Sequence, residues 1–258
     1  MAEIYSVLIT GASKGIGLEF VNQFLTNKSV KPHIIIATCR NPETATALQE
    51  LKKSDKKVHI LKLDVDHFEA YDKFMGEVKT IVKDKGLTLL INNAAICVPF
   101  SDTLEDVTPE KFISILTTNT VAPVMLTKAF YPLLKLSAEK NSKETKGLSV
   151  CRAAVINISS IGGSIKRRKG PALWCYRESK AALNMSTRTM AIEFKKDGIL
   201  VESFHPGVVD TDLLACPGGP PSEIDTATSV NGMISVMLQL TGKNEEGFPE
   251  YTGEILPF

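Results

Sequence analysis

Short apolar segments alternate with longer segments of helical periodicity along almost the whole of this sequence. The short segments are rich in Ile, Val and Leu, which is typical of strands buried on both faces of a parallel sheet. Their repeated strand–helix–strand order predicts an α/β fold, a doubly wound parallel sheet with helices on both faces. Strands are expected at residues 4–9, 33–39, 58–63, 87–91, 153–158 and 200–204. Helices are expected at residues 15–26, 43–53, 68–85, 109–135 and 174–196.

No linker divides the 258 residues, so we expect one domain over residues 1–258. Two segments depart from the alternating pattern. Residues 137–149 are strongly polar and are expected to form a surface excursion between a helix and the next strand. Residues 215–221, Ala-Cys-Pro-Gly-Gly-Pro-Pro, form a loop by composition and serve either as a spacer or as a substrate lid.

The composition excludes several classes of function. A net charge of +1 gives no support for binding to nucleic acid or to a membrane surface. No segment approaches the roughly 20 apolar residues that span a bilayer, and the amino terminus does not resemble a secretory signal. The five cysteines are scattered and the four histidines do not cluster. We therefore expect a cytoplasmic protein without a metal site.

A glycine-rich turn follows the first predicted strand, with the sequence Thr-Gly-Ala-Ser-Lys-Gly-Ile-Gly at residues 10–17. Glycines allow a tight turn close to a ligand, and the helix that follows directs unpaired N–H groups toward an anion. Such a turn between strand one and helix one is typical of a site for the pyrophosphate of a dinucleotide, although many loops need glycine only to turn. The residues expected to contact the cofactor here are Gly11, Ser13, Lys14, Gly15, Ile16 and Gly17.

The end of the second strand indicates which dinucleotide binds. NAD-binding proteins usually carry an acidic residue there, about 20 positions beyond the glycines. Residues 37–41 read Ala-Thr-Cys-Arg-Asn and contain no acid. Arg40 can pair with a 2′-phosphate and Lys14 can add a second cation, although both could also be ordinary surface charges. The sequence therefore favours NADP(H).

Tyr176 precedes Lys180 by four residues, which places the phenol and the ammonium on one face of a helix. A free tyrosine has a pKa near 10, and a fixed cation nearby favours the phenolate and lowers that pKa. Such a tyrosine can give a proton to a nascent alkoxide. The spacing also occurs by chance on many helices, so it gains weight only from the rest of the chain.

Four features occur in the order found in short-chain dehydrogenases/reductases: the glycine turn, Asn92-Asn93-Ala94-Ala95, Ser160 and Tyr176–Lys180. The chain resembles this family over essentially its full length. Residues 37–41, 119–121, 176–184 and 251–253 resemble a narrower group, the sniffer-type carbonyl reductases. The resemblance implies a Rossmann-type sheet of seven parallel strands in the order 3-2-1-4-5-6-7. It also implies a dinucleotide-binding half at about 1–105 and a catalytic and substrate half at about 106–258.

The resemblance assigns further residues to the cofactor. Asp64 and Val65 match the positions beside the adenine ring, although Asp64 could instead cap the next helix. Asn92 is expected to steady its strand or the loop over the cofactor. The loop after strand six is expected to contact the nicotinamide carboxamide through Pro206, Gly207, Val208, Val209 and Thr211.

The resemblance also implies four catalytic residues: Asn119, Ser160, Tyr176 and Lys180. Ser160 would hold the carbonyl oxygen, with Ser159 as the competing candidate, and Tyr176 would protonate that oxygen. Lys180 would lower the pKa of Tyr176 and bind the nicotinamide ribose. Asparagine is a poor helix residue, and Asn119 would interrupt its helix to hold a water that passes protons to Lys180; a merely tolerated asparagine is the alternative.

The expected function is NADPH-dependent reduction of ketone, aldehyde or quinone carbonyls. The alternatives are a dedicated biosynthetic reductase for a pterin or steroid ketone, and a non-catalytic NADP(H)-sensing protein. The basic residues 166–169 form either a solvated loop or an attraction for an anionic substrate. Family members often dimerise through the helices expected at 109–135 and 174–196, so a homodimer is conceivable here. An apolar substrate pocket is expected from Cys97, Val98, Pro99, Phe100, Trp174, Leu213 and Leu214.

Overall fold

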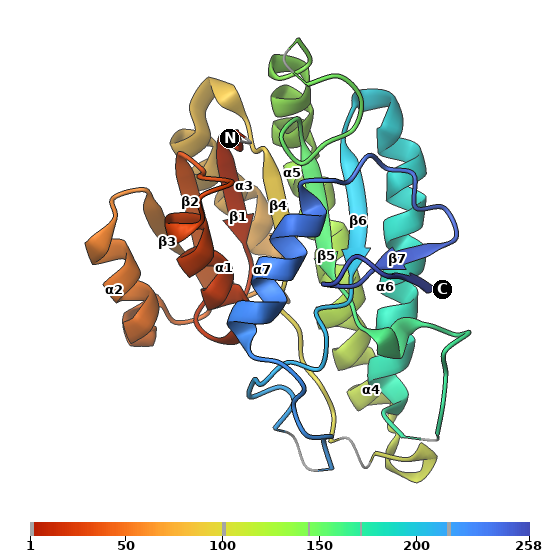
Figure 1. The fold of residues 1–258 in the computed structure, drawn as a ribbon. Coiled ribbons are helices and arrows are strands. Elements are labelled where there is room, and N and C mark those ends of the chain that lie inside the picture. The colour runs from red at the N-terminus through yellow and green to blue at the C-terminus, as the bar shows by residue number, and fades with distance from the viewer. Residues whose placement is uncertain (1–2, 100–101, 144, 171, 216–217) are drawn as a thin grey trace.

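A parallel sheet of six strands forms the centre of the molecule in the computed structural model, which describes residues 3–99, 102–143, 145–170, 172–215 and 218–258 (Figure 1). The strand order is β3-β2-β1-β4-β5-β6, and the order reverses between β1 and β4. Ligands of such sheets bind at the carboxyl ends of the strands beside this reversal. The strands are β1 (Ser6–Ile9), β2 (Ile34–Cys39), β3 (Val58–Lys62), β4 (Leu89–Asn92), β5 (Ala154–Ile158) and β6 (Leu200–Phe204).

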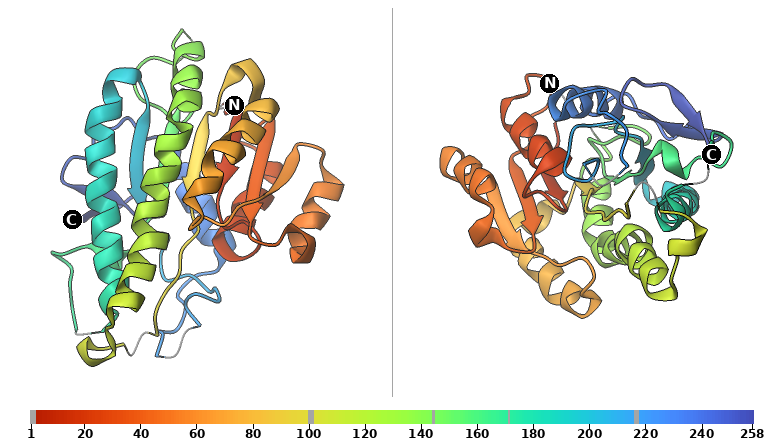
Figure 2. Two further views of the ribbon diagram at one scale, coloured as in Figure 1. Left: turned by 180° about the vertical axis from the view of Figure 1, so that it is seen from behind. Right: turned by 90° about the horizontal axis from the view of Figure 1, so that it is seen from below.

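Helices cover both faces of this sheet, as the views from the front and from behind show (Figures 1 and 2). One face carries α1 (Gly15–Thr26), α2 (Thr46–Ser54) and α7 (Thr226–Met237); the other carries α3 (Tyr71–Val82), α5 (Ala122–Lys140) and α6 (Trp174–Phe194). Alternate strand residues point to the two faces, so Ile9 and Leu8 belong to two different hydrophobic clusters. The predicted doubly wound α/β fold is confirmed.

Helix α7 was absent from the sequence-based expectations. Its sequence, Thr-Ala-Thr-Ser-Val-Asn-Gly-Met-Ile-Ser-Val-Met, is poor in strong helix formers. The helix is stabilised instead by tertiary packing, because Val230, Met233 and Ile234 lie in the core cluster under α1. The Asp225 side chain also caps its first turn by accepting from Thr228 N.

The long helix expected at 109–135 is interrupted. It begins as α4 (Pro109–Leu116), passes through a π-helical segment η5 (Thr117–Val121) and continues as α5. Such π segments often occur at functional sites. Short 3₁₀ segments supplement the other helices: η1 (Pro42–Thr44), η2 (Phe68–Ala70), η3 (Lys83–Lys85), η4 (Leu104–Asp106), η6 (Ile161–Gly163) and η7 (Lys195–Asp197).

The prediction of a seventh parallel strand in the main sheet is wrong for the described residues. β7 (Gly247–Pro249) pairs antiparallel with β8 (Ile255–Pro257), and a single parallel bridge between His205 and Glu250 connects this hairpin to the end of β6. Pro249 has no N–H to donate, which limits ladder formation at this position. The described sheet therefore has six strands, with a separate two-stranded sheet beside it.

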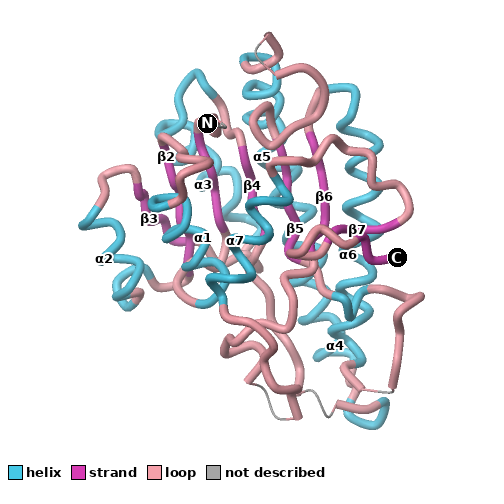
Figure 3. The backbone as a smooth tube through the Cα atoms, viewed as in Figure 1, coloured by secondary structure: helices cyan, strands magenta, loops and turns pink. Residues whose placement is uncertain are grey.

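Loops gather beyond the carboxyl ends of the strands, at the lower end of the view in Figure 3. The sheet thereby brings together segments that are far apart in the sequence. The polar segment 137–149 begins inside α5, which continues to Lys140, and most of its described residues from 139 onward are exposed or half-buried. Within the described ranges, no helix combines the length and the apolar character needed to cross a membrane.

Candidate active site

The glycine turn after β1 is held by side chains from the end of β4. Thr10 Oγ1 accepts hydrogen bonds from the N–H groups of Asn93 and Ala94, at 2.9 and 3.0 Å. Asn93 Nδ2 donates in turn to the carbonyl oxygens of Thr10 and Gly11. A Cβ at Gly17 would lie 2.4 Å from the Gly11 oxygen, and Gly11 itself has φ +65. Glycine suits both positions, Gly17 because a side chain has no space there and Gly11 because of its positive φ, and the turn lies in close contact with the end of β4.

Helix α1 begins at the end of this turn, as the sequence predicted. Its N-cap residue, Lys14, is extended, and no side chain caps the helix. The first-turn N–H groups can therefore bind an anion. Lys14 Nζ lies 2.5 Å from Asp212 Oδ2, and both side chains are largely exposed. The cation expected to bind phosphate is thus paired with an acidic residue of the loop that follows β6.

A pocket of about 280 Å³ lies between the glycine turn and the end of β2. Its lining includes the predicted Ser13, Lys14 and Arg40, and Arg40 is exposed. None of its lining residues is acidic. A phosphate group with its negative charge fits this set of donors and cations. The lining residues are Ser13, Lys14, Cys39, Arg40, Asn41, Thr44, Ala45, Thr46 and Ala47.

Three predicted cofactor residues make structural contacts at the ends of β3 and β4. Asp64 Oδ1 accepts from Asp66 N, so the carboxylate forms a turn and does not cap the next helix. Val65 contributes its carbonyl oxygen, which accepts from the Tyr71 hydroxyl at 2.6 Å. Asn92 is buried, and its Nδ2 donates to Asn157 Oδ1 and Thr127 Oγ1. These bonds use both amide protons of Asn92, whereas its Oδ1 is buried and forms no hydrogen bond with a described residue, so it is the side-chain atom that could still accept a bond.

Asn119 lies inside the π segment, and its side chain is 1% exposed. Its Oδ1 accepts from Ile96 N, while Nδ2 donates to Ile96 O and to Ser179 Oγ. The asparagine therefore fixes the segment after β4 against α6, the helix that carries Tyr176. The expected interruption of the helix at Asn119 is confirmed, and both amide protons are engaged in protein contacts.

The two candidate serines after β5 point to different partners. Ser159 is buried, and its hydroxyl donates to Asn184 Oδ1 on α6 at 2.7 Å. Ser160 Oγ accepts from Gly162 N at 3.0 Å and forms a side-chain hydrogen bond with Tyr176. Ser160 is therefore the hydroxyl beside the phenol, whereas Ser159 supports the helix behind it.

Tyr176 and Lys180 lie side by side in α6, with Lys180 Nζ 5.7 Å from the centroid of the tyrosine ring. Both side chains are buried, at 8% and 3% exposure. The ammonium donates to the carbonyl oxygen of Ile158 at 2.9 Å. These positions agree with the predicted helical face.

The electrostatics of this pair differ from the expectation. Burial raises the pKa of the Tyr176 phenol, and the hydrogen bond with Ser160 only partly opposes this effect. Burial also lowers the pKa of Lys180 to about 8. The expected lowering of the Tyr176 pKa by Lys180 is therefore wrong for this structure, because desolvation disfavours the charged form of both groups.

The loop after β6 is fixed by backbone contacts. Pro206 O accepts from Ser229 Oγ at 2.6 Å, and Val208 O accepts from Glu223 N at 2.8 Å. Thr211 lies next to the glycine turn, because a Cβ added at Gly15 would lie 3.4 Å from Thr211 Cγ2. Gly207, between these anchors, has φ +90. The loop thus lies against the glycine turn, and Val209 is buried within it.

An apolar cluster surrounds the tyrosine and includes Val98, Ile115, Leu173 and Cys175, with Cys97 packed against it. Of the residues predicted to line the substrate pocket, Val98 and Cys97 contribute to this cluster, and Phe100 lies outside the described residues. Trp174 is the half-buried first residue of α6 and is not part of this cluster, whereas the preceding Leu173 is; Leu173 adopts a left-handed conformation, φ +63. Non-glycine residues rarely adopt this conformation, so the surrounding structure must enforce it.

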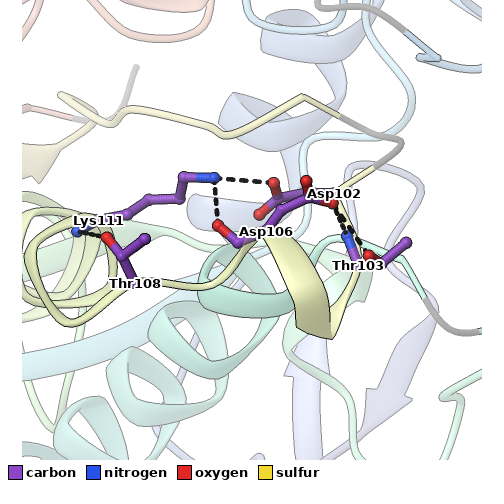
Figure 4. Close-up of polar contacts among 5 residues, drawn as sticks. All are labelled: Asp102, Thr103, Asp106, Thr108 and Lys111. Carbon is purple, nitrogen blue, oxygen red and sulfur yellow. Dashed lines mark hydrogen bonds and ion pairs between the residues drawn. The ribbon is translucent and has the colours of Figure 1, made fainter.

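A polar cluster anchors the segment that supplies Val98 and Cys97 (Figure 4). The buried Asp102 accepts from Lys111 Nζ at 3.0 Å, and Lys111 Nζ also donates to Asp106 O at 2.7 Å. The carbonyl oxygen of Asp102 accepts from Leu173 N. This contact ties the segment to the start of the helix that carries Tyr176.

Comparison with known proteins identifies the family. The sequence pattern described as short chain dehydrogenase matches residues 5–216. The chain belongs to this family. It is 39% identical to the carbonyl reductase Sniffer of Drosophila melanogaster, with 99% of this chain and 100% of that chain covered and a TM-score of 0.92. It is 36% identical to the NADPH-bound carbonyl reductase from chicken fatty liver, with coverage of 100% and 96% and a TM-score of 0.92.

A curated relative from Schizosaccharomyces pombe, an uncharacterised oxidoreductase, is 30% identical over 97% of this chain and 96% of its own length. These comparisons confirm the resemblance to the sniffer-type carbonyl reductases. The chain is therefore a short-chain dehydrogenase, a member of a family of oxidoreductases.

The structure adds site residues that the sequence reasoning had not singled out. Asn93 and Thr10 hold the glycine turn, and Asp66 accepts from the Thr118 hydroxyl and so ties the β3 loop to the π segment. The sequence did contain a signal for Asn93, because an asparagine directly after the fourth strand can donate to the neighbouring glycine turn. Asp66 and Asp102 contact segments that are distant in the sequence, and a local sequence pattern cannot predict such contacts.

The remaining candidates are surface features. In the basic segment 166–169, Arg167 pairs with Glu254 and the segment is exposed. Pro217 and Cys216 of the proline–glycine loop lie outside the described residues.

Across the described ranges, no group of three or more His, Cys, Asp or Glu side chains could hold a metal ion.

Proposed function

We propose that this short-chain dehydrogenase reduces ketone, aldehyde or quinone carbonyls with NADPH. The observation that carries the proposal is the buried Tyr176 phenol, hydrogen-bonded to Ser160 and one helical turn from Lys180. A phenol protonated at neutral pH beside a hydroxyl donor is suited to bind a carbonyl oxygen and to protonate it. The similarity to two carbonyl reductases, one of them bound to NADPH, supports this reaction.

Tyr176 would act as the general acid, and Ser160 would hold the carbonyl oxygen next to it. Both groups donate to an oxygen that gains negative charge during reduction, so they favour the transition state over the substrate. Gly162 N donates to Ser160 Oγ at 3.0 Å, which orients the serine beside Tyr176; its hydroxyl would turn from the phenol oxygen to the carbonyl oxygen when a substrate binds. The raised pKa of Tyr176 keeps the proton on the phenol until the oxygen becomes basic enough to take it.

Lys180 and Asn119 would resupply that proton. Lys180 is fixed by its hydrogen bond to Ile158 O, and its lowered pKa makes proton release easier near neutral pH. Both Nδ2 protons of Asn119 are used in contacts with Ile96 and Ser179. A water in the relay would therefore bind the backbone of the π segment, where the regular helical hydrogen-bond pattern is interrupted.

The cofactor would bind along the carboxyl edge of the sheet, and when bound NADPH supplies the hydride. The pyrophosphate would bind at the start of α1, and Arg40 with Ser13 would hold the 2′-phosphate in the pocket that lacks acidic residues. Asp64 and Val65 would flank the adenine. The loop 206–211 would contact the carboxamide, and Lys180 the ribose.

The substrate would meet a mostly apolar wall. Val98, Leu173 and Cys97 lie in or against the cluster around Tyr176. This wall favours aromatic or polycyclic carbonyl compounds over small polar sugars.

The proposal is tested by measuring NADPH oxidation with an ortho-quinone, an aromatic aldehyde, a steroid ketone and sepiapterin, with NADH in parallel. Broad NADPH-dependent turnover led by the quinone is expected. Activity on one substrate alone would identify a dedicated biosynthetic reductase. Tight NADPH binding without turnover of any substrate would contradict the proposal and favour a sensing role.

Two further properties remain proposals. No disulfide joins the cysteines in the described part of the chain, which supports a reducing compartment such as the cytoplasm. A homodimer through α4 and α6 is supported by the exposed Ile113 and Met185 on these helices. Light scattering on the purified protein would distinguish a dimer from a monomer.

A further inference from the structure

Asp102 is a buried acid that connects the substrate wall to the helix of Tyr176. The residue is 4% exposed and follows the segment that supplies Val98. Its carbonyl oxygen accepts from Leu173 N at 3.2 Å, directly before α6. Its carboxylate pairs with Lys111 Nζ on α4 at 3.0 Å (Figure 4). One residue thus contacts both α4 and the entry to α6.

Lys111 joins this acid to the turn that precedes α4. Its Nζ donates to Asp106 O at 2.7 Å as well as to Asp102 Oδ1. Thr103 donates to Asp106 Oδ2 through both its N and its Oγ1, which closes the short η4. Thr108 Oγ1 accepts from Lys111 N and caps α4. The segment between β4 and α4 therefore folds around one ammonium group.

The acid of this pair depends on the lysine. Asp102 Oδ2 is buried and forms no hydrogen bond with a described residue. Among the described residues, Lys111 is the cation that pairs with this carboxylate. Removal of one partner from a buried ion pair is strongly destabilising, because the other charge is left buried without compensation. Loss of the ammonium should therefore move Asp102 toward water, and the entry to α6 with it.

The start of α6 gives a second reason for a carboxylate at this place. Its N-cap residue, Leu173, has φ +63 and forms no side-chain capping bond. Burial raises the pKa of the Cys175 thiol, and the charge of Asp102 adds to this rise, so the carboxylate lies near the first turn of α6. A negative charge near a helix N-terminus is favourable. The acid therefore stabilises the start of the helix that carries Tyr176.

The side chains that depend on this pair are those of the apolar wall. Val98, Leu173 and Ile115 belong to the cluster around Tyr176. Val98 precedes the acid of the pair in the chain, Leu173 is bonded to it, and Ile115 lies one helical turn after the lysine. A displacement of the pair would therefore move all three side chains relative to the phenol.

We propose that Asp102 and Lys111 are positioning residues that hold the apolar wall against Tyr176 and thereby favour large apolar carbonyl compounds over small ones. This inference rests on the reductase function proposed above. The pair acts through the wall and not on the reacting atoms. A fixed wall contributes binding free energy only to a substrate large enough to reach it. A small aldehyde, held mainly at its oxygen, gains little from the wall.

Lys111→Met tests this role, because it removes the ammonium and keeps an unbranched side chain. We expect kcat/KM for a three-ring ortho-quinone to fall about tenfold through a higher KM, with kcat nearly unchanged. The kcat/KM for butanal should change less than about twofold. Lys111→Arg keeps the cation and should retain the parent preference. Lys128→Met, at an exposed lysine of α5, is the matched control.

Trp174 gives a readout that does not depend on turnover. It is the only tryptophan of the chain and the half-buried first residue of α6, next to Leu173. We expect acrylamide to quench its fluorescence about twofold more strongly in Lys111→Met than in the parent, because the start of α6 opens locally. Lys111→Arg and Lys128→Met should match the parent. An inactive chain with this quenching pattern would contradict the reductase function and support the positioning by the pair.

Two further variants separate positioning from a general loss of stability. Asp102→Asn leaves only the half-exposed lysine without its partner, so the chain should fold and lose part of its preference for the quinone, by a few-fold. The double variant Lys111→Met/Asp102→Asn buries no unpaired charge. Its losses in Tm and in quinone KM should be smaller than those of Lys111→Met.

Three results would overturn the proposal. The first is a Lys111→Met chain with the parent preference and the parent quenching of Trp174. The second is an equal loss of kcat/KM with quinone and butanal, which would mean that the pair only stabilises the fold. The third is an Asp102→Asn chain that folds and keeps the full preference for the quinone, which decides the matter even where Lys111→Met does not fold.

Discussion

The two ends of the cofactor cleft use charge in opposite ways. At the β2 end, Lys14 and Arg40 are exposed to water, and Lys14 is already paired with Asp212. At the β5 end, Tyr176 and Lys180 are buried, and burial shifts the pKa of both. Exposed charges interact weakly and are screened by salt, whereas buried charges respond strongly to each neighbour. We therefore expect the exposed end to select the cofactor and the buried end to carry the proton chemistry.

The largest effect is expected from the buried end. Tyr176→Phe removes the acidic O–H with little change in shape, and we expect carbonyl turnover to fall by roughly a thousandfold or more. NADPH binding, followed by fluorescence titration, should remain nearly unchanged. Turnover at the parent rate would show that the buried pair is not the catalytic centre. Cys175→Ser, at the adjacent buried position, controls for disturbance of the helix.

The pH profile is expected to give the next largest effect. Below its pKa of about 8, Lys180 carries a proton and supports the relay; above that value it is neutral. The kcat/KM for reduction should therefore fall as pH rises through about 8, approaching tenfold per pH unit. Lys180→Arg keeps a cation that does not titrate in this range and should lose this fall, although its absolute rate will be lower. A parent profile that stays flat to pH 10 would contradict a relay that depends on charged Lys180.

Arg40→Ala tests the exposed end. We expect kcat/KM with NADPH to fall by about tenfold to a hundredfold, the effect of one lost charge-assisted contact with phosphate, while the value with NADH changes little. Lys56→Ala, at an exposed lysine that does not line the pocket, is the matched control. Equal losses with both cofactors would mean that Arg40 does not read the 2′-phosphate.

The smallest effect is expected for Asp212→Asn. The change releases Lys14 from its exposed ion pair, and such pairs contribute at most about 1 kcal/mol. NADPH should therefore bind a few-fold more tightly at low salt, with the difference shrinking as salt is added. Weaker binding in the variant would indicate that Asp212 supports the site through the loop after β6. Isothermal titration at two ionic strengths distinguishes these outcomes.

The roles of these residues stay predictions until such measurements are made, but their places in the fold were largely readable from the sequence. Local composition specifies the strands expected at 4–9, 33–39 and 200–204. It also specifies the glycine turn that follows the first of them. Apolar runs of this length are typical of strands buried inside a sheet, and glycine adopts the positive φ found at Gly11 without steric cost. The spacing of Tyr176 and Lys180 is likewise a local property of any helix.

Other features depend on contacts between distant segments, and these only the tertiary structure decided. Helix α7 lacks strong local propensity and is stabilised by packing on α1, while β7 pairs with β8 and does not extend the main sheet. The raised pKa of Tyr176 follows from burial, which no four-residue spacing can report. Local sequence thus determined the elements and the chemistry they carry, whereas desolvation and long-range pairing, which exist only after folding, determined how that chemistry is tuned.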